Sequence, residues 1–506
     1  MFVLLFQGFV TLFSSPVNLL VIVVGVGVGI IIGAMPGLTA TMGIAIALPL
    51  TFGMPPETGL TLLCSIFVGG IHGGGIPAIL IKTPGTPASS ATILDGFALS
   101  ERGEASVALG IHVFSSSTGS FLATILLIFG STLLAKFALQ FGPAEYFLLA
   151  MFGLSVVSAV TGESVTKGLL TAALGLLLST VGMDPIVGFS RFSFGVWELM
   201  DGFNLVPALI GLFAIAQIFI ELDHIDVAIV KAKRIKLKLP SLSQVKECSL
   251  TIIKSAVMGT MIGAIPGPGA VLGSFIPYAE AKRSSKHPER FGKGSIEGIA
   301  AAEAGNNSAA IGAIIPTLTL GIPGEAATAV LLGGLMILGL RPGPMLFKDN
   351  ASTVYTVFAA ILLSAIVLFF IGLFLAQHMG KLIIIPKRIL LPIILLLCII
   401  GSFAIRKSIF DIGVAVGFGV LGYLLSRFGY PVVPVLLGLI LGPIAESNFR
   451  RALMISRGDP LIFVNNGFAI GIIVLTIVSL IFGYRLTQSL NRRFAEEVQG
   501  EDQQST

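Results

Sequence analysis

Long apolar runs separated by short polar stretches dominate the pattern of this chain. A helix needs about 20 apolar residues to cross the hydrocarbon core of a bilayer. The longer runs lie at 17–34, 58–80, 106–135, 145–161, 203–221, 352–376, 384–404, 409–425 and 461–484, and shorter or interrupted ones at 38–53, 168–182, 252–277, 297–322, 325–340 and 430–443. The pattern predicts an all-α polytopic integral membrane protein with about 12 transmembrane helices plus re-entrant or broken helices.

Composition supports this class. Hydrophobic residues make up 55% of the chain and charged residues 11%, against about 25% charged residues in soluble domains. The 61 glycines and 26 prolines predict broken or closely packed helices, because small residues let backbones approach and proline removes a backbone hydrogen bond. The net charge of +5 is weak evidence for an acidic partner, since cytoplasmic loops collect basic residues for topological reasons.

Two basic stretches suggest an orientation. The segment KAKRIKLKLPSLSQVK at 231–246 has no acidic residue, so it predicts a cytoplasmic loop. A second basic stretch follows at 281–294, and GAIPGPGA at 263–270 interrupts the apolar run between them. A re-entrant hairpin with a Pro-Gly tip would place both basic stretches on one side of the membrane.

Two motifs recur in the same order. IGAMPG at 32–37 matches IGAIPG at 262–267, and the surroundings of Pro84 resemble those of Pro323, which indicates an internal duplication. The flank of the first copy lacks basic residues and that of the second is rich in them. The positive-inside rule then places equivalent loops on opposite sides, so we expect two inverted structural repeats.

The resulting domain boundaries are a first membrane repeat over 1–225 with broken segments at 33–37 and 82–92, a basic cytoplasmic loop over 226–250, a second membrane repeat over 251–445 with broken segments at 263–270 and 316–328, a C-terminal membrane segment over 446–484, and a polar tail over 485–506.

The broken segments are the candidate binding site. Paired Gly/Pro-interrupted segments in two halves point to a substrate site near the midplane of the membrane. In KTPGTPASSAT at 82–92 the prolines stop one helix and the hydroxyl residues can cap the next, leaving N–H groups that attract an anion. The alternative is that each break is a simple kink. Lys82 could serve the site or could extend to the membrane interface.

Four other titratable residues keep two interpretations each. His72, within GGIHGGG, could carry a proton, although a histidine among glycines is more often a packed polar residue. Asp95, Glu303 and Glu325 could bind a coupling ion or could cap and pair structurally.

Four motifs resemble the large membrane subunit of tripartite tricarboxylate transporters, the TctA family. They are GAMPGLTATMGIAIALPLTF, GGGIPAILIKTPGTPASSATILDG, IPTLTLGIPGEAATAVLLGGL and LGLILGPIAESNFRRAL, and the likeness covers about residues 15–485. The resemblance implies a multi-pass secondary transporter in the bacterial cytoplasmic (inner) membrane that imports tricarboxylates or related carboxylates by alternating access. It further implies a sodium or proton gradient as the driving force, no cofactor, and no nucleic-acid partner.

Such systems combine three proteins. The resemblance implies a small membrane subunit similar to TctB and a periplasmic solute-binding protein similar to TctC as partners. The substrate-binding residues it implies are Pro36, Gly37, Thr39, Thr41, Lys82, Pro84, Gly85, Thr86, Ser89, Ser90, Pro266, Gly267, Asn306, Asn307, Pro323, Gly324 and Thr328. A sodium site near Asn306, Asn307 and Thr328 is a further expectation. Lys82 stands where the family often has Asn, so the lysine could bind one more carboxylate or replace a bound cation.

Other functional classes fit the sequence less well. An anion channel needs a continuous pore lined by charge, and arginine and lysine are scarce within the apolar runs. A carboxylate exporter that works without a binding protein is a second alternative. An intramembrane enzyme would need a catalytic pattern such as HExxH or GxSxG in context, and the sequence contains neither, so we expect no enzyme.

Overall fold

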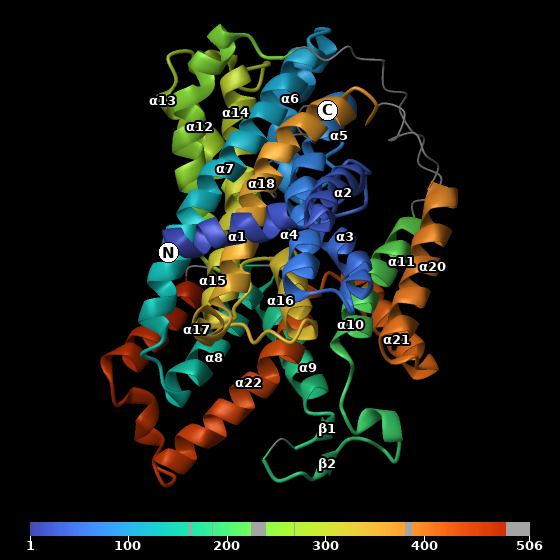
Figure 1. Cartoon of the computed structure of the whole chain (residues 1–506), viewed down its shortest axis with the longest axis vertical. Coiled ribbons are helices and arrows are strands. Elements are labelled where there is room, and N and C mark those ends of the chain that lie inside the picture. The colour runs from blue at the N-terminus through green and yellow to red at the C-terminus, as the bar shows by residue number, and fades with distance from the viewer. Residues whose placement is uncertain (161–163, 185, 224–238, 268, 380–386, 482–506) are drawn as a thin grey trace, which may run out of the picture. The chain divides into compact units, whose positions relative to one another are not determined.

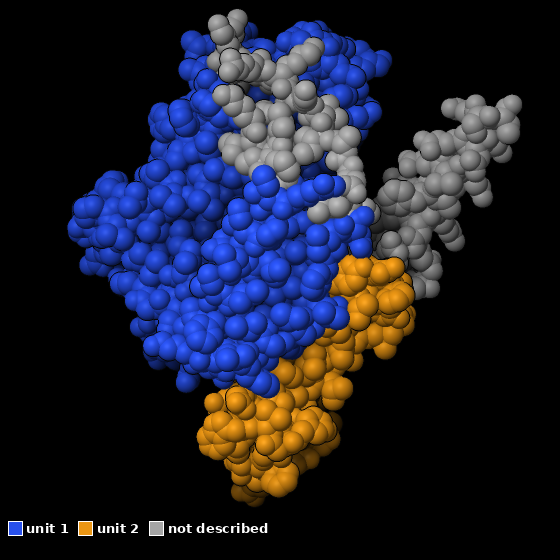
Figure 2. Space-filling model, turned by 90° about the vertical axis from the view of Figure 1, so that its right-hand side faces the viewer, with its two compact units in different colours: residues 1–139, 206–420 blue, residues 140–205, 421–506 orange. Residues whose placement is uncertain are grey.

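The computed structural model describes residues 1–160, 164–184, 186–223, 239–267, 269–379 and 387–481. The described chain is mainly helical, and its two strands are two residues long each. It divides into two compact units, which Figure 2 colours separately: unit 1 contains residues 1–139 and 206–420, and unit 2 contains residues 140–205 and 421–506.

Unit 1 begins with one series of helices and continues, after the return from unit 2, with another (Figure 1). The first series is α1 (Phe2–Ser14), α2 (Pro16–Gly33), α3 (Ala40–Ala47), η1 (Leu48–Thr51), α4 (Pro56–Gly73), α5 (Gly75–Ile81), η2 (Pro87–Ser89), α6 (Ser90–Glu101) and α7 (Ala105–Ala138). The second is α10 (Leu205–Leu209), the π-helix η4 (Ile210–Ile215), α11 (Ala216–Leu222), α12 (Leu242–Gly263), α13 (Gly269–Ser284), η5 (Pro288–Arg290), α14 (Ile296–Gly312), α15 (Ile314–Leu320), α16 (Ala326–Ile337), α17 (Pro344–Asp349), α18 (Ala351–Ala376) and α20 (Lys387–Arg406). Helix α21 (Ile409–Arg427) begins in unit 1 and ends in unit 2.

The two series repeat one order of elements. Helices α2 to α7 match α12 to α16 and α18 in turn, with α17 as an insertion. Gly37 (φ 90°) follows α2 as Gly267 (φ 113°) follows α12. The short helix α5 ends at Lys82 (φ 58°), and α15 ends at Gly321 (φ 71°), both in the left-handed region. The order of breaks predicted from the two recurring motifs is therefore present in the backbone.

The series pack against each other in a matched way. Helix α2 lies along α4 and α12 along α14, while α14 also packs on α7 and α4 on α18 (Figure 1). A β-carbon at Gly29 or Gly33 of α2 would overlap the backbone of α4, and one at Gly263 of α12 would overlap the backbone of α14. Glycine at these positions lets the helix backbones touch, as small residues do at membrane helix interfaces.

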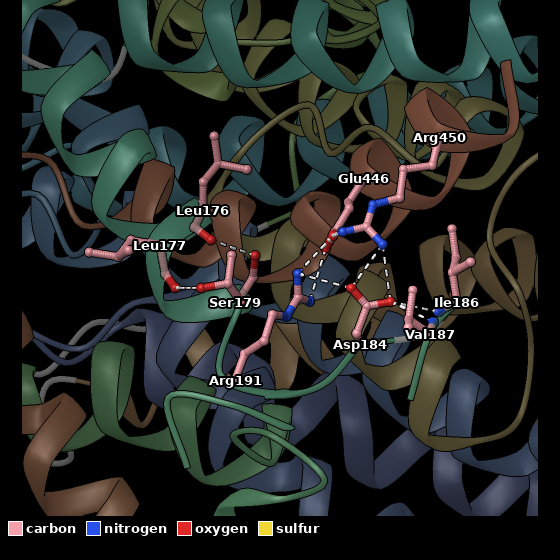
Figure 3. Close-up of polar contacts among 10 residues, drawn as sticks. Leu176, Leu177, Ser179, Asp184, Ile186, Val187, Arg191, Glu446 and Arg450 are labelled. Atoms are coloured by element: carbon pink, nitrogen blue, oxygen red, sulfur yellow. Dashed lines mark hydrogen bonds and ion pairs between the residues drawn. The ribbon is translucent and has the colours of Figure 1, made fainter. Parts of the chain in front are cut away.

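Unit 2 joins distant parts of the chain. It contains α8 (Pro143–Val160), α9 (Val165–Ser179), β1 (Gly182–Met183), β2 (Ser190–Arg191), η3 (Trp197–Leu199), α22 (Val433–Ile455) and η6 (Pro460–Val464), and the two strands pair antiparallel. Helix α22 packs on α8 and α9. Four charged side chains fix the β1–β2 segment to α22 (Figure 3): Arg450 binds Asp184 at 2.8 Å and Arg191 binds Glu446 at 2.8 Å.

Seven described helical segments are long and apolar enough to cross a membrane: Pro16–Gly33, Pro56–Ile81, Ala105–Ala138, Leu205–Leu222, Ala351–Ala376, Lys387–Arg406 and Ile409–Arg427. The prediction of an all-α membrane protein is thus confirmed. The count of about 12 crossings, the inversion of the repeats and the domain boundaries stay predictions. The charged part of the predicted basic loop, 231–238, and the polar tail, 485–506, lie outside the described residues, whereas 242–250 form the first turns of α12.

Candidate functional site

The two predicted breaks of the first series lie together. The carbonyl of Gly33, at the end of α2, faces Gly85 so closely that a β-carbon at Gly85 would overlap it. The Gly85 N–H donates to the Gly74 carbonyl at 3.0 Å. A β-carbon at Gly74 would lie 2.5 Å from Thr86 Oγ1 and 2.8 Å from Ser89 Oγ. The turn after α2, the α4–α5 junction and the break before α6 therefore form one local site.

The second series brings the equivalent segments together with a different hydrogen bond. The Gly267 N–H donates to the Gly324 carbonyl at 3.0 Å. A β-carbon at Gly324 would lie 3.0 Å from the carbonyl oxygen of Gly263, which ends α12. The predicted pairs Pro266–Gly267 and Pro323–Gly324 are thus brought together, although the N–H groups of Gly85 and Gly267 are used by the backbone itself. Pro268 lies outside the described residues.

Each turn has a protein carboxylate beside it. A β-carbon at Gly37 would overlap the carboxylate of Glu221, which also pairs with Lys387 Nζ at 2.5 Å. In the second series Glu325 Oε2 accepts a hydrogen bond from the N–H of Ala270, in the first turn of α13, at 3.2 Å. Only the second turn shows a backbone N–H bound to its carboxylate, because Glu221 binds the side chains of Lys387 and Gln217 instead.

Several of the predicted substrate-binding residues make local hydrogen bonds at the starts of helices. Thr39 Oγ1 accepts from the Met42 N–H at 3.3 Å and caps α3. Ser90 Oγ donates to the Pro87 carbonyl at 2.8 Å. Thr328 Oγ1 accepts from the Glu325 N–H at 3.0 Å and donates to the Glu325 carbonyl at 2.9 Å. Thr41 lies in the first turn of α3, and Pro36 and Pro84 lie in the turns.

Lys82 is exposed at the break. Its Nζ lies 5.7 Å from the centroid of the Phe97 ring on α6, within the range of a cation–π contact. Its backbone adopts the conformation that the second series gives to Gly321.

A fully buried polar cluster lies beside the first-series break. Glu303 of α14 has no exposed surface, and it accepts hydrogen bonds from Thr92 Oγ1 of α6 at 2.5 Å and Ser116 Oγ of α7 at 3.1 Å. His112 Nδ1 lies 3.1 Å from Glu303 Oε2, within ion-pairing distance but without hydrogen-bond alignment. The His112 ring stacks on that of His72 from α4, with centroids 4.2 Å apart. Neither ring nitrogen of His72 has a hydrogen-bond partner among the described residues.

The two predicted asparagines belong to this cluster or lie next to it. Asn307 Nδ2 donates to the Glu303 carbonyl at 3.0 Å, and Asn307 Oδ1 has no hydrogen-bond partner within the described chain. Both polar atoms of the Asn306 side chain are likewise buried and unpartnered there. Thr328 bonds to Glu325 instead, so the hydrogen bonds do not join the three residues of the expected sodium site.

The hydrogen bonds of Asp95 indicate a structural role. Its Oδ1 accepts from the N–H groups of Gly292, Gly294 and Ser295 at 2.7–2.8 Å, and its Oδ2 accepts from the Tyr278 hydroxyl at 2.8 Å. These bonds hold the segment that leads into α14, so capping is the interpretation that the geometry favours.

Sequence reasoning missed His112, Ser116 and the role of Thr92. His72 and Glu303 were singled out as residues, but 231 positions separate them along the chain, and only the packing of α4, α7 and α14 brings them together. The available signal was α14, a buried helix of mostly small residues that carries a glutamate and two asparagines in its middle, at 303, 306 and 307.

Two helix series, each broken where a glycine turn lies against a second break, define a polytopic membrane protein of the discontinuous-helix type. A model of the tripartite tricarboxylate transporter TctA family matches residues 19–437. The chain belongs to this family, and the resemblance expected from its motifs is confirmed. It is therefore a membrane subunit of a tricarboxylate transporter family, and membership of this family points to a transporter rather than an enzyme.

Two relatives come from Agrobacterium vitis. An uncharacterised 52.8 kDa protein in the TAR-I ttuC′ 3′ region is 38% identical over 467 residues, which cover 92% of this chain and 93% of that protein. An uncharacterised protein in the TAR-II ttuC′ 3′ region is 39% identical over 223 residues, which cover 44% of this chain and 92% of that protein. No solved structure matches the chain.

Proposed function

We propose that this chain is the large permease subunit of a tripartite, ion-gradient-driven transporter that imports tricarboxylates or related carboxylates. The observation that carries the proposal is the matched pair of breaks. In each series a positive-φ glycine follows the first helix, Gly37 or Gly267, and that helix end lies against the break before α6 or α16. Paired discontinuous helices are the arrangement by which many secondary transporters hold a small ligand.

A carboxylate is the ligand class that this backbone favours. The starts of α6 and α16 follow Ser89 and Glu325, and helix starts present N–H groups and a positive dipole end. Substrate carboxylates would lie near the N–H groups at the starts of α6 and α16. Hydroxyls of Thr86, Ser89 and Ser90 would set the orientation of the substrate.

The partners follow from the family. A periplasmic solute-binding protein similar to TctC would deliver the carboxylate, and a small membrane subunit similar to TctB would complete the permease in the bacterial inner membrane. Alternating access would move one repeat-containing unit against a fixed scaffold.

The test is uptake by the reconstituted complex. The chain, with its small membrane subunit and binding protein, is placed in liposomes, and entry of labelled citrate is measured under an imposed sodium or proton gradient. We expect saturable uptake that requires one of the gradients and the binding protein. Leak of many anions without a gradient would instead show a channel, and transport that is indifferent to the binding protein would favour the exporter alternative.

Lys82→Asn tests whether the first residue of the break between α5 and α6 contributes to substrate recognition. A changed preference between tricarboxylates and dicarboxylates would place the lysine in the recognition site. An unchanged preference would leave recognition to the backbone and the hydroxyls of the break.

A further inference from the structure

The buried cluster is in direct contact with the first-series break. A β-carbon at Gly75 would lie 2.5 Å from Glu303 Oε1 and would overlap the His112 ring, and the preceding Gly74 lies against Thr86 and Ser89. Thr92 lies in the first turn of α6, directly after the break, and donates its hydroxyl to Glu303. A change at Glu303 therefore acts on α6 through one hydrogen bond.

The charge of the cluster depends on protons. The hydroxyls of Thr92 and Ser116 are neutral donors, so a Glu303 carboxylate obtains a full positive partner only when an imidazole is protonated. The two imidazoles are stacked with centroids 4.2 Å apart, and like charges at this spacing disfavour each other. One proton shared by Glu303, His112 and His72 leaves the cluster neutral, and its loss leaves one buried negative charge.

The described residues around the cluster supply no other cation. Among the described residues packed on α14, helix α6 contributes Asp95 and α13 contributes Tyr278, and these two bind each other and the start of α14. The remaining charged residues of α14 and its neighbouring helices are exposed or paired. The exposed ones are Lys246, Glu247 and Lys254 on α12, Lys282 on α13, Glu101 on α6 and Lys136 on α7. Glu280 pairs with Arg283 on α13, Glu297 of α14 accepts a hydrogen bond from Ser285, Glu57 of α4 accepts one from Thr353, and Lys82 lies over Phe97. Helices α5, α15 and α18 contain no acidic or basic residue.

The second series shows that the fold does not require these polar side chains. At the spacing that separates Pro84 from Pro323, the counterparts of Glu303, Thr92 and Gly75 are Cys64, Leu331 and Ile314. These three residues also lie together, and they line an apolar pocket. The counterpart of His72 is the buried Ile311. One of two equivalent places is therefore apolar and the other is a buried acid–imidazole cluster.

We propose that Glu303, His112 and His72 form the proton-coupling site of this transporter. The proposal rests on the proposed function and adds the coupling ion and its place. A proton from water on one side of the membrane adds to Glu303 Oε2 or His112 Nδ1 and neutralises the cluster. Its release to the other side restores the negative charge, so one proton crosses in each cycle. The Thr92 hydrogen bond couples these two states to the position of α6 and hence to the break.

Two measurements, citrate accumulation under a pH difference and citrate exchange without a gradient, distinguish a loss of proton coupling from a loss of transport. Liposomes with the full complex are clamped at zero membrane potential, and labelled citrate is followed under a difference of one pH unit. One-proton coupling gives an accumulation ratio of about 10, because one pH unit corresponds to about 1.4 kcal/mol. In Glu303→Gln we expect a ratio of about 1, while exchange of internal for external citrate without a gradient continues.

The control variant is Glu57→Gln. Glu57 lies on α4, the helix of His72, and accepts a hydrogen bond from Thr353 at 2.6 Å. This contact is away from the cluster, so Glu57→Gln should keep the wild-type accumulation ratio. Wild-type accumulation in Glu303→Gln would overturn the proposal. Accumulation that follows a sodium gradient at equal pH, and that is lost in Glu303→Gln, would overturn the proton assignment and give the site to sodium.

An infrared titration tests the proposed proton site without a substrate. The full chain in lipid nanodiscs is titrated over the pH range in which it stays folded, and the carboxyl and imidazole infrared bands are recorded. We expect a protonated-carboxyl band or an imidazole band that titrates in the wild type and in Glu57→Gln and is lost or shifted in Glu303→Gln. The absence of any difference between the wild type and Glu303→Gln would refute the site even if transport is confirmed. Failure of wild-type exchange would refute the proposed function but would leave this titration valid.

Discussion

The close contact of α2 with α4 gives a test of the packing that positions the first break. A β-carbon at Gly29 would lie within 3.0 Å of three backbone atoms of Ile66 and Gly70 on α4. Backbone atoms cannot move aside as the end of a flexible side chain can, so Gly29→Ala must push the helices apart. Such overpacking costs about 1–3 kcal/mol.

Gly27 on the same helix is the matched control. A β-carbon there has no neighbour within 4 Å among the described atoms. Both substitutions gain about 1 kcal/mol or less of helix propensity, so the difference between the two variants isolates the packing cost. We expect Gly29→Ala to be less stable than Gly27→Ala by about 1–3 kcal/mol.

Thermal unfolding of the purified full chain in detergent measures this difference. Gly29→Ala should unfold several degrees below Gly27→Ala, and its citrate uptake should fall with the displacement of the α2 end from Gly85. Equal unfolding temperatures for the two variants would refute the direct backbone contact between α2 and α4.

Two further variants and one pH dependence test other parts of the chain. Asp95→Asn removes the charge that holds the start of α14, so it should lower stability by about 1–3 kcal/mol and raise amide exchange at residues 292–298; unchanged exchange would contradict the cap. In unit 2, the N–H groups of Val187 and Ile186, and then Arg450, lower the pKa of Asp184 from 3.8 to about 2. A lowered pKa in the folded state stabilises the fold above the ordinary pKa and loses this effect as the pH falls towards 2, so proteolytic protection of the β1–β2 segment should be constant near neutral pH and fall below about pH 4; a loss that begins near pH 6 would contradict this cause. Lys82→Gly should raise the unfolding temperature slightly, because a left-handed backbone costs a non-glycine residue about 1–2 kcal/mol, and a lower temperature would mean that the Phe97 contact contributes more.

The helix breaks were predictable because their cause is local. Proline at 36 and 84 and glycine at 37 and 85 disfavour a continuous helix whatever packs around them, and the same holds at 266–267 and 323–324. The capping role of Thr39 was not among the expectations, although a hydroxyl residue before an apolar run is typical of a helix start.

The buried cluster was not predictable because its cause is tertiary. His72, His112 and Glu303 come from three helices whose sequences show no common motif, and Glu303 could equally have been a helix cap like Asp95. Unit 2 is similar: the Asp184–Arg450 pair joins residues 266 positions apart, which no local pattern reveals. The positions of Glu221 and Glu325 beside the glycine turns also depend on how distant helices pack.

Proton movement driven by the substrate tests whether citrate entry is coupled to protons through Glu303. Citrate is added to voltage-clamped liposomes that contain the full complex, in weak buffer at a pH where the tricarboxylate is fully ionised, and the external pH is recorded. We expect external alkalinisation in the wild type and in Glu57→Gln, and none in Glu303→Gln. Entry of citrate into wild-type liposomes without a change in external pH would contradict this coupling.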